Sequence, residues 1–176
     1  MALRSRDTLF KAPDILFVCL GNICRSPLAE GISRAKLDAR GERVKVASCG
    51  TGRWHVGEAP DPGSVAAAQR KGLDISSQRA RHLSDFVLDQ IPLIITMDQQ
   101  NFRDVRAALG ATYPREGLWL LRQFEPETGV KIPRATSQTE GVFDPYGSGA
   151  DRFDEVYQQI ERCCEALLEW RSQLKA

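Results

Sequence analysis

The sequence predicts an α/β fold built on a parallel sheet. Short apolar runs alternate along the chain with segments that have the three- and four-residue spacing of helices, a pattern typical of strands joined by right-handed helical crossovers. The runs at 15–20 and 93–97 are almost uninterrupted, as expected for strands buried on both faces. A chain of 176 residues is long enough for one compact domain, and a second full domain would be crowded.

The charge balance argues against a strongly charged partner. Lys and Arg number 24 and Asp and Glu 23, so the formal net charge is +1 and no broad field favours a nucleic acid or an acidic membrane surface. No apolar stretch approaches the roughly 18 residues of a membrane span. The N-terminus has no run of signal-peptide length, so we expect a cytoplasmic protein, with secretion by a signal-independent route left open.

The first third of the chain contains two expected strands and one helix. Residues 1–13 have mixed charge and predict a loose N-terminal extension, after which the run at 15–20 predicts the first strand. Ser26-Pro27 opens a helix that Gly41 closes. A second strand is expected at 44–47, followed by a turn-rich segment at 48–62.

The middle of the chain predicts two more helices and the third strand. A helix at 65–71 ends before Gly72, and a brief helical turn is expected at 85–89. The third buried strand is 93–97. Asp98 follows it and can cap a helix over 99–109.

The last third predicts a fourth strand, a long loop and a terminal helix. The strand is expected at 118–121, and the Gly- and Pro-containing polar stretch at 124–150 predicts a loop of a length that is usually functional or mobile. A helix follows from about residue 151. We therefore expect one domain over 14–176. The apolar stripe of its last helix comprises Phe153, Val156, Tyr157, Ile160, Cys164, Leu167 and Leu168.

The cysteines indicate a reducing compartment rather than a disulfide framework. Five thiols at uneven spacings, with two histidines, give neither a paired set nor zinc-site spacing, so no metal is expected. Cys163-Cys164 fall on or near the apolar stripe of the last helix and are interpreted as core residues. The five are Cys19, Cys24, Cys49, Cys163 and Cys164.

The segment between the first strand and the first helix predicts an anion-binding loop. Backbone N–H groups and the helix dipole converge at such a position, and Gly21 is expected to supply the unusual backbone angles of the loop. The guanidinium of Arg25 matches two phosphate oxygens. We expect the phosphate to be bound by Leu20, Gly21, Asn22, Ile23, Cys24, Arg25 and Ser26.

The same loop predicts a nucleophile. The positive potential of the loop should favour the thiolate of Cys19, which would then lie beneath a bound phosphate and attack phosphorus in line. A hydrogen bond from Ser26 should make that thiolate a better leaving group. A buried strand cysteine is the alternative, disfavoured by the presence of Arg25 and Ser26 in one loop.

The block CLGNICRSPLAE after a buried strand closely resembles the low-molecular-weight protein tyrosine phosphatases. Similar segments at 48–52, 97–101, 143–147 and 156–159 extend the resemblance over most of the chain. It implies a four-stranded parallel sheet flanked by helices on both faces. It also implies a phosphotyrosine phosphatase with a cysteinyl-phosphate intermediate, inorganic phosphate as a product and no cofactor.

The resemblance gives roles to residues outside the loop. Asp144 is implied as general acid and base, although an Asp-Pro in a Gly-rich stretch is otherwise a turn former. Trp54 and Tyr146 are candidate aromatic walls of a slot that favours phosphotyrosine, and Gly147 follows where the family usually has a second aromatic residue. Relatives that take phosphoarginine have threonine in place of Ile23, so isoleucine favours phosphotyrosine.

Asp98 and Cys24 have two interpretations each. Asp98 either helps to orient Arg25 or only caps its helix. Asn22 braces the loop, and the family often pairs it with a histidine where this chain has Gln78; His82 is interpreted as an ordinary surface histidine. Cys24 either forms a reversible disulfide with Cys19 under peroxide or simply packs in the loop.

Two other functions compete with the phosphatase hypothesis. Arsenate reductases use a similar loop but need two further cysteines on a mobile segment, and the interval 51–162 contains none. A catalytically silent phosphotyrosine-binding protein would not need Cys19, Arg25, Ser26 and Asp144 together. A phosphotyrosine protein, such as a tyrosine kinase, is the expected partner.

Overall fold

The structure, a computed structural model, describes residues 12–126 and 141–174, and its centre is a parallel sheet. The four strands run in the order β2-β1-β3-β4, and every pairing is parallel. The predicted fold class is therefore confirmed. Because β1 lies in the middle, its carboxyl end is flanked by two neighbouring strand ends, where α/β proteins bind ligands. The strands are β1 (Ile15–Cys19), β2 (Val46–Gly50), β3 (Leu93–Thr96) and β4 (Leu118–Leu120).

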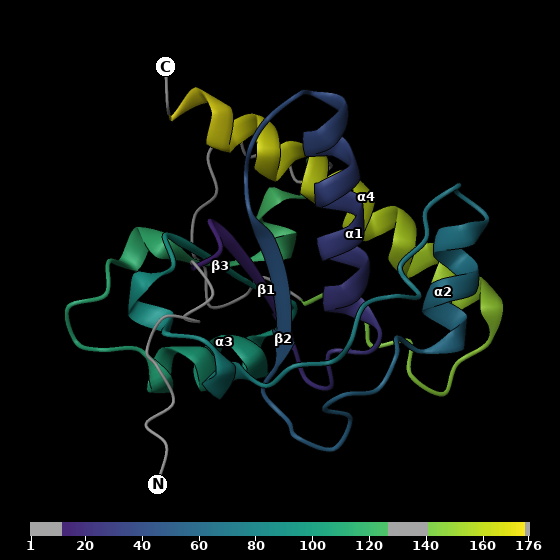
Figure 1. The fold of residues 1–176 in the computed structure, drawn as a ribbon, viewed down its shortest axis with the longest axis horizontal. Coiled ribbons are helices and arrows are strands. Elements are labelled where there is room, and N and C mark those ends of the chain that lie inside the picture. Colours follow the sequence, from purple (N-terminus) through teal and green to yellow (C-terminus); the bar gives the residue numbers. More distant parts are fainter. Residues whose placement is uncertain (1–11, 127–140, 175–176) are drawn as a thin grey trace, which may run out of the picture.

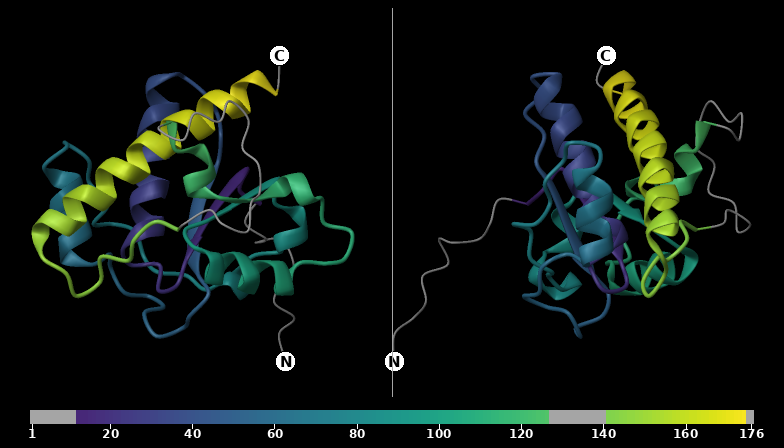
Figure 2. Two further views of the ribbon diagram at one scale, coloured as in Figure 1. Left: turned by 180° about the vertical axis from the view of Figure 1, so that it is seen from behind. Right: turned by 90° about the vertical axis from the view of Figure 1, so that its right-hand side faces the viewer.

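Helices cover both faces of the sheet (Figures 1 and 2). Three helices pack on one face, and α3 (Gln99–Ala108) packs on the other. Each face of the sheet has its own hydrophobic core, and alternate side chains of β1 contribute to one or the other. Ile15 and Phe17 face the three helices, whereas Leu16 and Val18 face α3. The three helices on the first face are α1 (Arg25–Ala39), α2 (Pro62–Gln69) and α4 (Ala150–Gln173).

The apolar stripe predicted for the last helix is the face that α4 buries. All seven predicted positions are buried, and Cys163 is buried beside them. The helix begins at Ala150, one residue before the expected start. The Asp98 cap is confirmed as well, because its carboxylate accepts a hydrogen bond from the Asn101 N–H at 2.8 Å.

The second strand was misplaced by the sequence prediction. β2 includes Ser48, Cys49 and Gly50, which were assigned to the turn-rich segment, and these residues pair with the end of β1. The polar side chain of Ser48 is tolerated in a buried strand because its hydroxyl donates to Glu30 Oε2 at 2.5 Å. Strand pairing thus overrides a local composition that favours a turn.

Two helical segments also differ from the prediction. α2 starts at Pro62 instead of 65, because the Asp61 carboxylate accepts from the Gly63 N–H at 2.7 Å and proline suits the first helical position. The helical turn expected at 85–89 is replaced by two 3₁₀ turns, Leu83–Asp85 and Leu88–Gln90.

The expected loose segments are only partly within the described residues. Ala12 packs against the core under α3 and Pro13 is buried, so the end of the predicted extension is ordered; residues 1–11 lie outside the described part. In the predicted 124–150 loop, Phe124 belongs to a 3₁₀ turn (Leu121–Phe124) and 141–149 contain no helix or strand. Residues 127–140 lie outside the described part.

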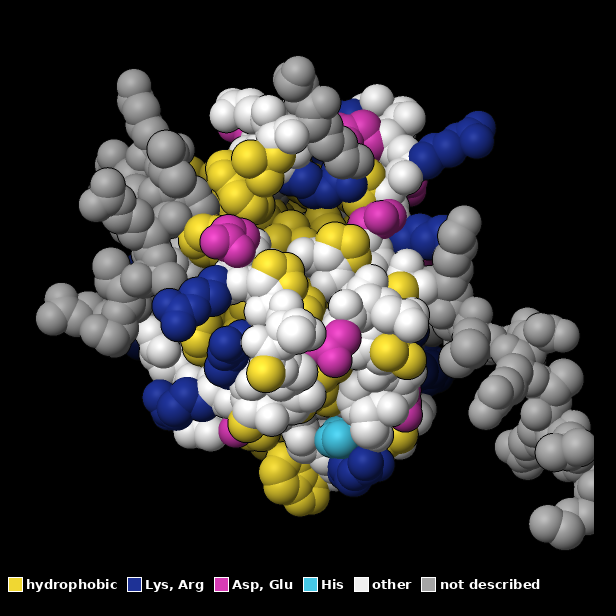
Figure 3. Space-filling view, turned by 90° about the vertical axis from the view of Figure 1, so that its left-hand side faces the viewer, with side chains coloured by type: hydrophobic (Ala, Val, Ile, Leu, Met, Phe, Trp, Pro, Cys, Tyr) yellow, Lys and Arg dark blue, Asp and Glu magenta, His cyan; other side chains and the backbone are white. Residues whose placement is uncertain are grey.

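The distribution of charged side chains on one face of the molecule agrees with the formal net charge of +1. Lys and Arg side chains lie among Asp, Glu and neutral ones on the face shown in Figure 3, without a field of one sign. No helix in the described part of the chain is long and apolar enough to cross a membrane.

Candidate active site

The loop between β1 and α1 closes around the end of the central strand. Cys19 is the last residue of β1, and α1 begins six residues later at Arg25. The loop is fastened to the following segment by two backbone hydrogen bonds, Thr51 N–H to Cys19 O at 3.0 Å and Gly52 N–H to Leu20 O at 2.8 Å. The loop is therefore held from outside as well as by its own turns.

The unusual backbone angles of the loop belong to Asn22, not to Gly21 as predicted. Asn22 has φ 55°, and no positive φ occurs at Gly21. Asparagine is among the non-glycine residues that best tolerate this region. The conformation aims the Asn22 N–H at Cys19 Sγ, 3.2 Å away. Gly21 is needed for space instead, because a Cβ there would lie 3.0 Å from the His55 ring.

Cys19 is surrounded by hydrogen-bonding groups. Its sulfur lies 3.0 Å from Ser26 Oγ as well as 3.2 Å from the Asn22 N–H, and both partners are buried. Ser26 Oγ can also donate to the Cys49 carbonyl at 3.3 Å. Donors aimed at sulfur stabilise a thiolate, so this geometry supports the predicted nucleophile.

The amide of Asn22 braces the loop with both of its ends. Nδ2 donates to Ser26 Oγ at 2.8 Å and to Ser48 Oγ at 2.9 Å, and Oδ1 accepts from the Arg81 backbone N–H at 2.8 Å. The predicted bracing by Asn22 is thus present in the structure. Gln78 does not take part: its amide donates to the Pro27 carbonyl at 3.1 Å.

His82 is not the ordinary surface histidine that the sequence suggested. Its ring nitrogens lie 2.8 Å from Ser84 Oγ and 3.1 Å from the Thr51 carbonyl. The residue also forms a bridge to Gly50 at the edge of the sheet. It therefore fixes the segment that leaves β2 beside the anion-binding loop.

Arg25 is held under the loop by partners far away in the chain. One guanidinium nitrogen donates to Asp98 Oδ2 at 2.8 Å and to the Val142 carbonyl at 3.0 Å, and the other donates to Asp144 Oδ2 at 3.0 Å. Its Nε is buried without a partner among the described residues. Burial alone would lower the pKa of Arg25, but Cys19, Asp144 and Asp98 outweigh this effect and raise it. The cation is therefore permanent. Asp98 caps α3 and holds Arg25 at the same time.

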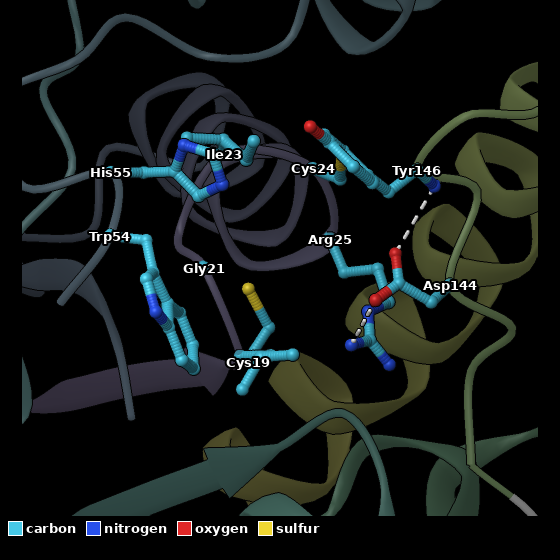
Figure 4. A pocket seen from close by; sticks show the side chains of 10 residues that line it. Cys19, Gly21, Ile23, Cys24, Arg25, Trp54, His55, Asp144 and Tyr146 are labelled. Carbon is cyan, nitrogen blue, oxygen red and sulfur yellow. Dashed lines mark hydrogen bonds and ion pairs between the residues drawn. The ribbon is translucent and has the colours of Figure 1, made fainter. Parts of the chain in front are cut away.

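A pocket of about 150 Å³ opens above Cys19 (Figure 4). Trp54 and Tyr146 line it, and these two residues are 73% and 61% exposed, so both rings are accessible from solvent. Asp144 lies on the Tyr146 side. His55, which the sequence analysis missed, lines the pocket beside Ile23, and no local pattern in the sequence distinguishes it.

All five cysteines are free and buried. Burial, with smaller contributions from Asp61 and Cys19, strongly raises the pKa of Cys24, so this residue is a neutral thiol. Cys163 and Cys164 are fully buried in α4 and have raised pKa values for the same main reason. The two thiols in α4 are therefore poorly placed for the relay that arsenate reduction would need.

The fold and the site define a class: α/β proteins whose first strand ends in a cysteine enclosed by the loop that leads into the first helix. In the described residues, no cluster of three His, Cys, Asp or Glu side chains forms a metal site.

Comparison with known proteins places the chain within that class. The family described as low molecular weight phosphotyrosine protein phosphatase matches residues 14–176. A low molecular weight protein-tyrosine-phosphatase, YfkJ of Bacillus subtilis (strain 168), is 38% identical over 157 residues, or 88% of this chain and 92% of YfkJ. The Homo sapiens low molecular weight phosphotyrosine protein phosphatase is 33% identical over 158 residues, which cover 88% of this chain and 93% of the human protein. The crystal structure of YfkJ superposes with a TM-score of 0.78 at 33% identity, covering 96% of this chain and 99% of that one. The chain belongs to the low molecular weight phosphotyrosine protein phosphatase family.

Proposed function

We propose that this chain is a protein tyrosine phosphatase that hydrolyses phosphotyrosine through a cysteinyl-phosphate. The observation that carries the proposal is the placement of Cys19 Sγ, 3.0 Å from Ser26 Oγ and 3.2 Å from the Asn22 N–H, beneath a pocket that also contains Arg25 and Asp144. Membership of the family supports the same reaction.

In the first step, the Cys19 thiolate attacks phosphorus in line with the tyrosyl oxygen. The S–P bond forms while the P–O bond to tyrosine breaks, and protonated Asp144 gives its proton to the departing oxygen. Arg25 and the loop N–H groups stabilise the charge on the three equatorial oxygens. In the unliganded enzyme Asp144 pairs with Arg25, so an incoming phosphate competes with this carboxylate for the guanidinium.

In the second step, Asp144 acts as a base. It takes a proton from water, whose oxygen attacks phosphorus, and the S–P bond breaks to release inorganic phosphate and the thiolate. Ser26 lies at hydrogen-bond distance from the sulfur and stabilises it as the leaving group. The cycle uses only groups of this chain and water.

The exposed rings of Trp54 and Tyr146 support a preference for an aromatic phosphate ester. A phosphotyrosine ring reaches from the loop to both side chains, whereas the shorter phosphoserine would leave them uncovered. We propose a phosphotyrosine protein as the partner, with a tyrosine kinase as one candidate. We also propose a cytoplasmic location, given the five free thiols, and a single phosphatase domain over 14–176.

The test is phosphate release from a phosphotyrosine peptide by the wild type and by Cys19→Ser, from mildly acidic to neutral pH. We expect turnover that the substitution abolishes, and a single phosphoryl adduct on Cys19 after acid quench and mass spectrometry. Thermal melting checks that the variant is folded. Turnover by folded Cys19→Ser would refute the mechanism, whereas peptide binding without turnover by the wild type would favour the silent binding protein.

A further inference from the structure

His55 lines the active-site pocket but has no part in the chemistry described above. Its ring lies over the anion-binding loop, where a Cβ on Gly21 would approach the ring carbon Cδ2 to 3.0 Å, and its centroid is 6.0 Å from that of the Tyr146 ring. Figure 4 shows the imidazole beside Ile23, with Trp54 on one side of it and Tyr146 on the other. A substrate entering the pocket therefore passes this side chain.

A carboxylate fixes which nitrogen of the ring faces the substrate. His55 Nδ1 lies 2.7 Å from Glu58 Oε2, and because a carboxylate only accepts, Nδ1 carries the proton in this hydrogen bond. Nε2 has no hydrogen-bond partner in the described part of the chain. The pair thus presents Nε2 as the free nitrogen, and a doubly protonated ring presents it as a charged donor.

The segment that carries this pair is rigidly attached. The backbone bonds that join 51–52 to the loop hold its start, and its end is held by Gly57 N–H to Ala80 O at 2.8 Å and Ala80 N–H to Glu58 O at 2.9 Å. Glu58 N–H also donates to the His55 carbonyl at 2.9 Å. A side chain fixed before binding loses little entropy on contact with a ligand.

The charges around the pocket indicate what Nε2 would bind. Arg25 lies beneath the loop, where it would bind the phosphate of the substrate. Asp144 adds negative charge on the Tyr146 side of the pocket. His55 is the other residue lining the pocket that can be cationic. It lies between Trp54 and Tyr146, which are both exposed, so the polypeptide next to a bound phosphotyrosine would pass close to it.

We propose that His55, positioned by Glu58, is a specificity-determining residue that binds a carboxylate of the substrate polypeptide next to the phosphotyrosine. In the doubly protonated ring, Nδ1–H donates to Glu58 and Nε2–H donates to that carboxylate, so the enzyme favours phosphotyrosine flanked by Asp or Glu. This inference rests on the proposed function, since it concerns the substrate of the same pocket.

The test compares two phosphotyrosine peptides that differ only by Glu or Gln beside the phosphotyrosine, at pH 6. We expect kcat/KM to be about three- to tenfold higher for the acidic peptide, the range for one partly exposed charge-assisted contact, and the difference to lie in KM. His55→Gln and Glu58→Gln should both bring the ratio toward one. Lys71→Gln, which removes an exposed cation that does not line the pocket, should keep the wild-type ratio.

A wild-type ratio of one, or a preference that persists in His55→Gln, would overturn the inference while leaving the phosphatase function intact. If the wild type hydrolyses neither peptide, the proposed function fails separately, and peptide affinity for Cys19→Ser then decides the inference. Equal affinities for the two peptides would contradict it, and tighter binding of the acidic peptide that His55→Gln abolishes would support it.

Discussion

Asp98 performs two tasks that one pair of substitutions can separate. One carboxylate oxygen caps α3 through the Asn101 N–H, and the other accepts from Arg25, whose side chain is 3% exposed. Asp98→Asn keeps a capping oxygen but removes the charge, whereas Asp98→Ala removes both. Without the charge, Asp144 becomes the remaining carboxylate partner of Arg25 and draws the guanidinium away from the phosphate position.

The magnitudes follow from the two hydrogen bonds. A hydrogen bond to a charged group contributes about 1.5–3 kcal/mol, so both variants should lose roughly 10- to 150-fold in kcat/KM for a phosphotyrosine peptide. The cap contributes about 1 kcal/mol, so Asp98→Ala should unfold at lower urea than Asp98→Asn by about that free energy. Steady-state kinetics and urea unfolding measure the two effects. Wild-type activity in Asp98→Asn, or losses of activity that simply parallel stability, would refute the reasoning.

Three more expectations follow from individual contacts. Asp144→Asn should lower kcat about 100-fold for phosphotyrosine but much less for p-nitrophenyl phosphate, whose leaving group needs no proton; equal losses in parallel assays would contradict the general-acid role. Gly50→Ala should reduce phosphate affinity and lower the melting temperature, because the new Cβ would lie 2.6 Å from the Leu20 carbonyl oxygen; an unchanged melt with unchanged affinity would argue against this close contact. Burial raises the pKa of Tyr113 to about 12, so the folded state retains a proton that the unfolded chain loses near pH 10. The contribution of the protonated Tyr113 to the free energy of unfolding is therefore complete below pH 10 and is lost as the pH rises toward 12. The urea midpoint of Tyr113→Phe should accordingly fall less steeply than that of the wild type between pH 10 and 12.

The parts of the site that are contiguous in the chain were predictable from the sequence. The spacing of Cys19, Arg25 and Ser26 after an apolar strand identified the loop, because local order alone brings these residues together. Asp144 required the family resemblance, since a local interpretation of an Asp-Pro gives only a turn.

The contacts that depend on the tertiary fold could not be predicted. Arg25 meets the Val142 carbonyl across 117 residues, and no periodicity in the sequence encodes such a contact. Its contact with Asp98, across 73 residues, was one of two interpretations of Asp98, and the fold shows that this side chain both caps α3 and holds Arg25. His55 was missed for the same reason, because its position in the pocket depends on the neighbours that the fold supplies. The positive φ was assigned to Gly21 on propensity, but the hydrogen bonds of Asn22 decide which residue adopts it.

The hydroxyl of Ser26 has one hydrogen and two possible acceptors, the Cys19 sulfur and the Cys49 carbonyl. When Cys19 is a thiol, its S–H can donate to Ser26 Oγ while the hydroxyl hydrogen points to the carbonyl. When the sulfur is an anion, or leaves phosphorus as one, rotation about a single C–O bond turns that hydrogen to the sulfur. This rotation of the Ser26 hydroxyl requires no displacement of the backbone. The loop can therefore keep one conformation while the charge on the Cys19 sulfur changes during the reaction.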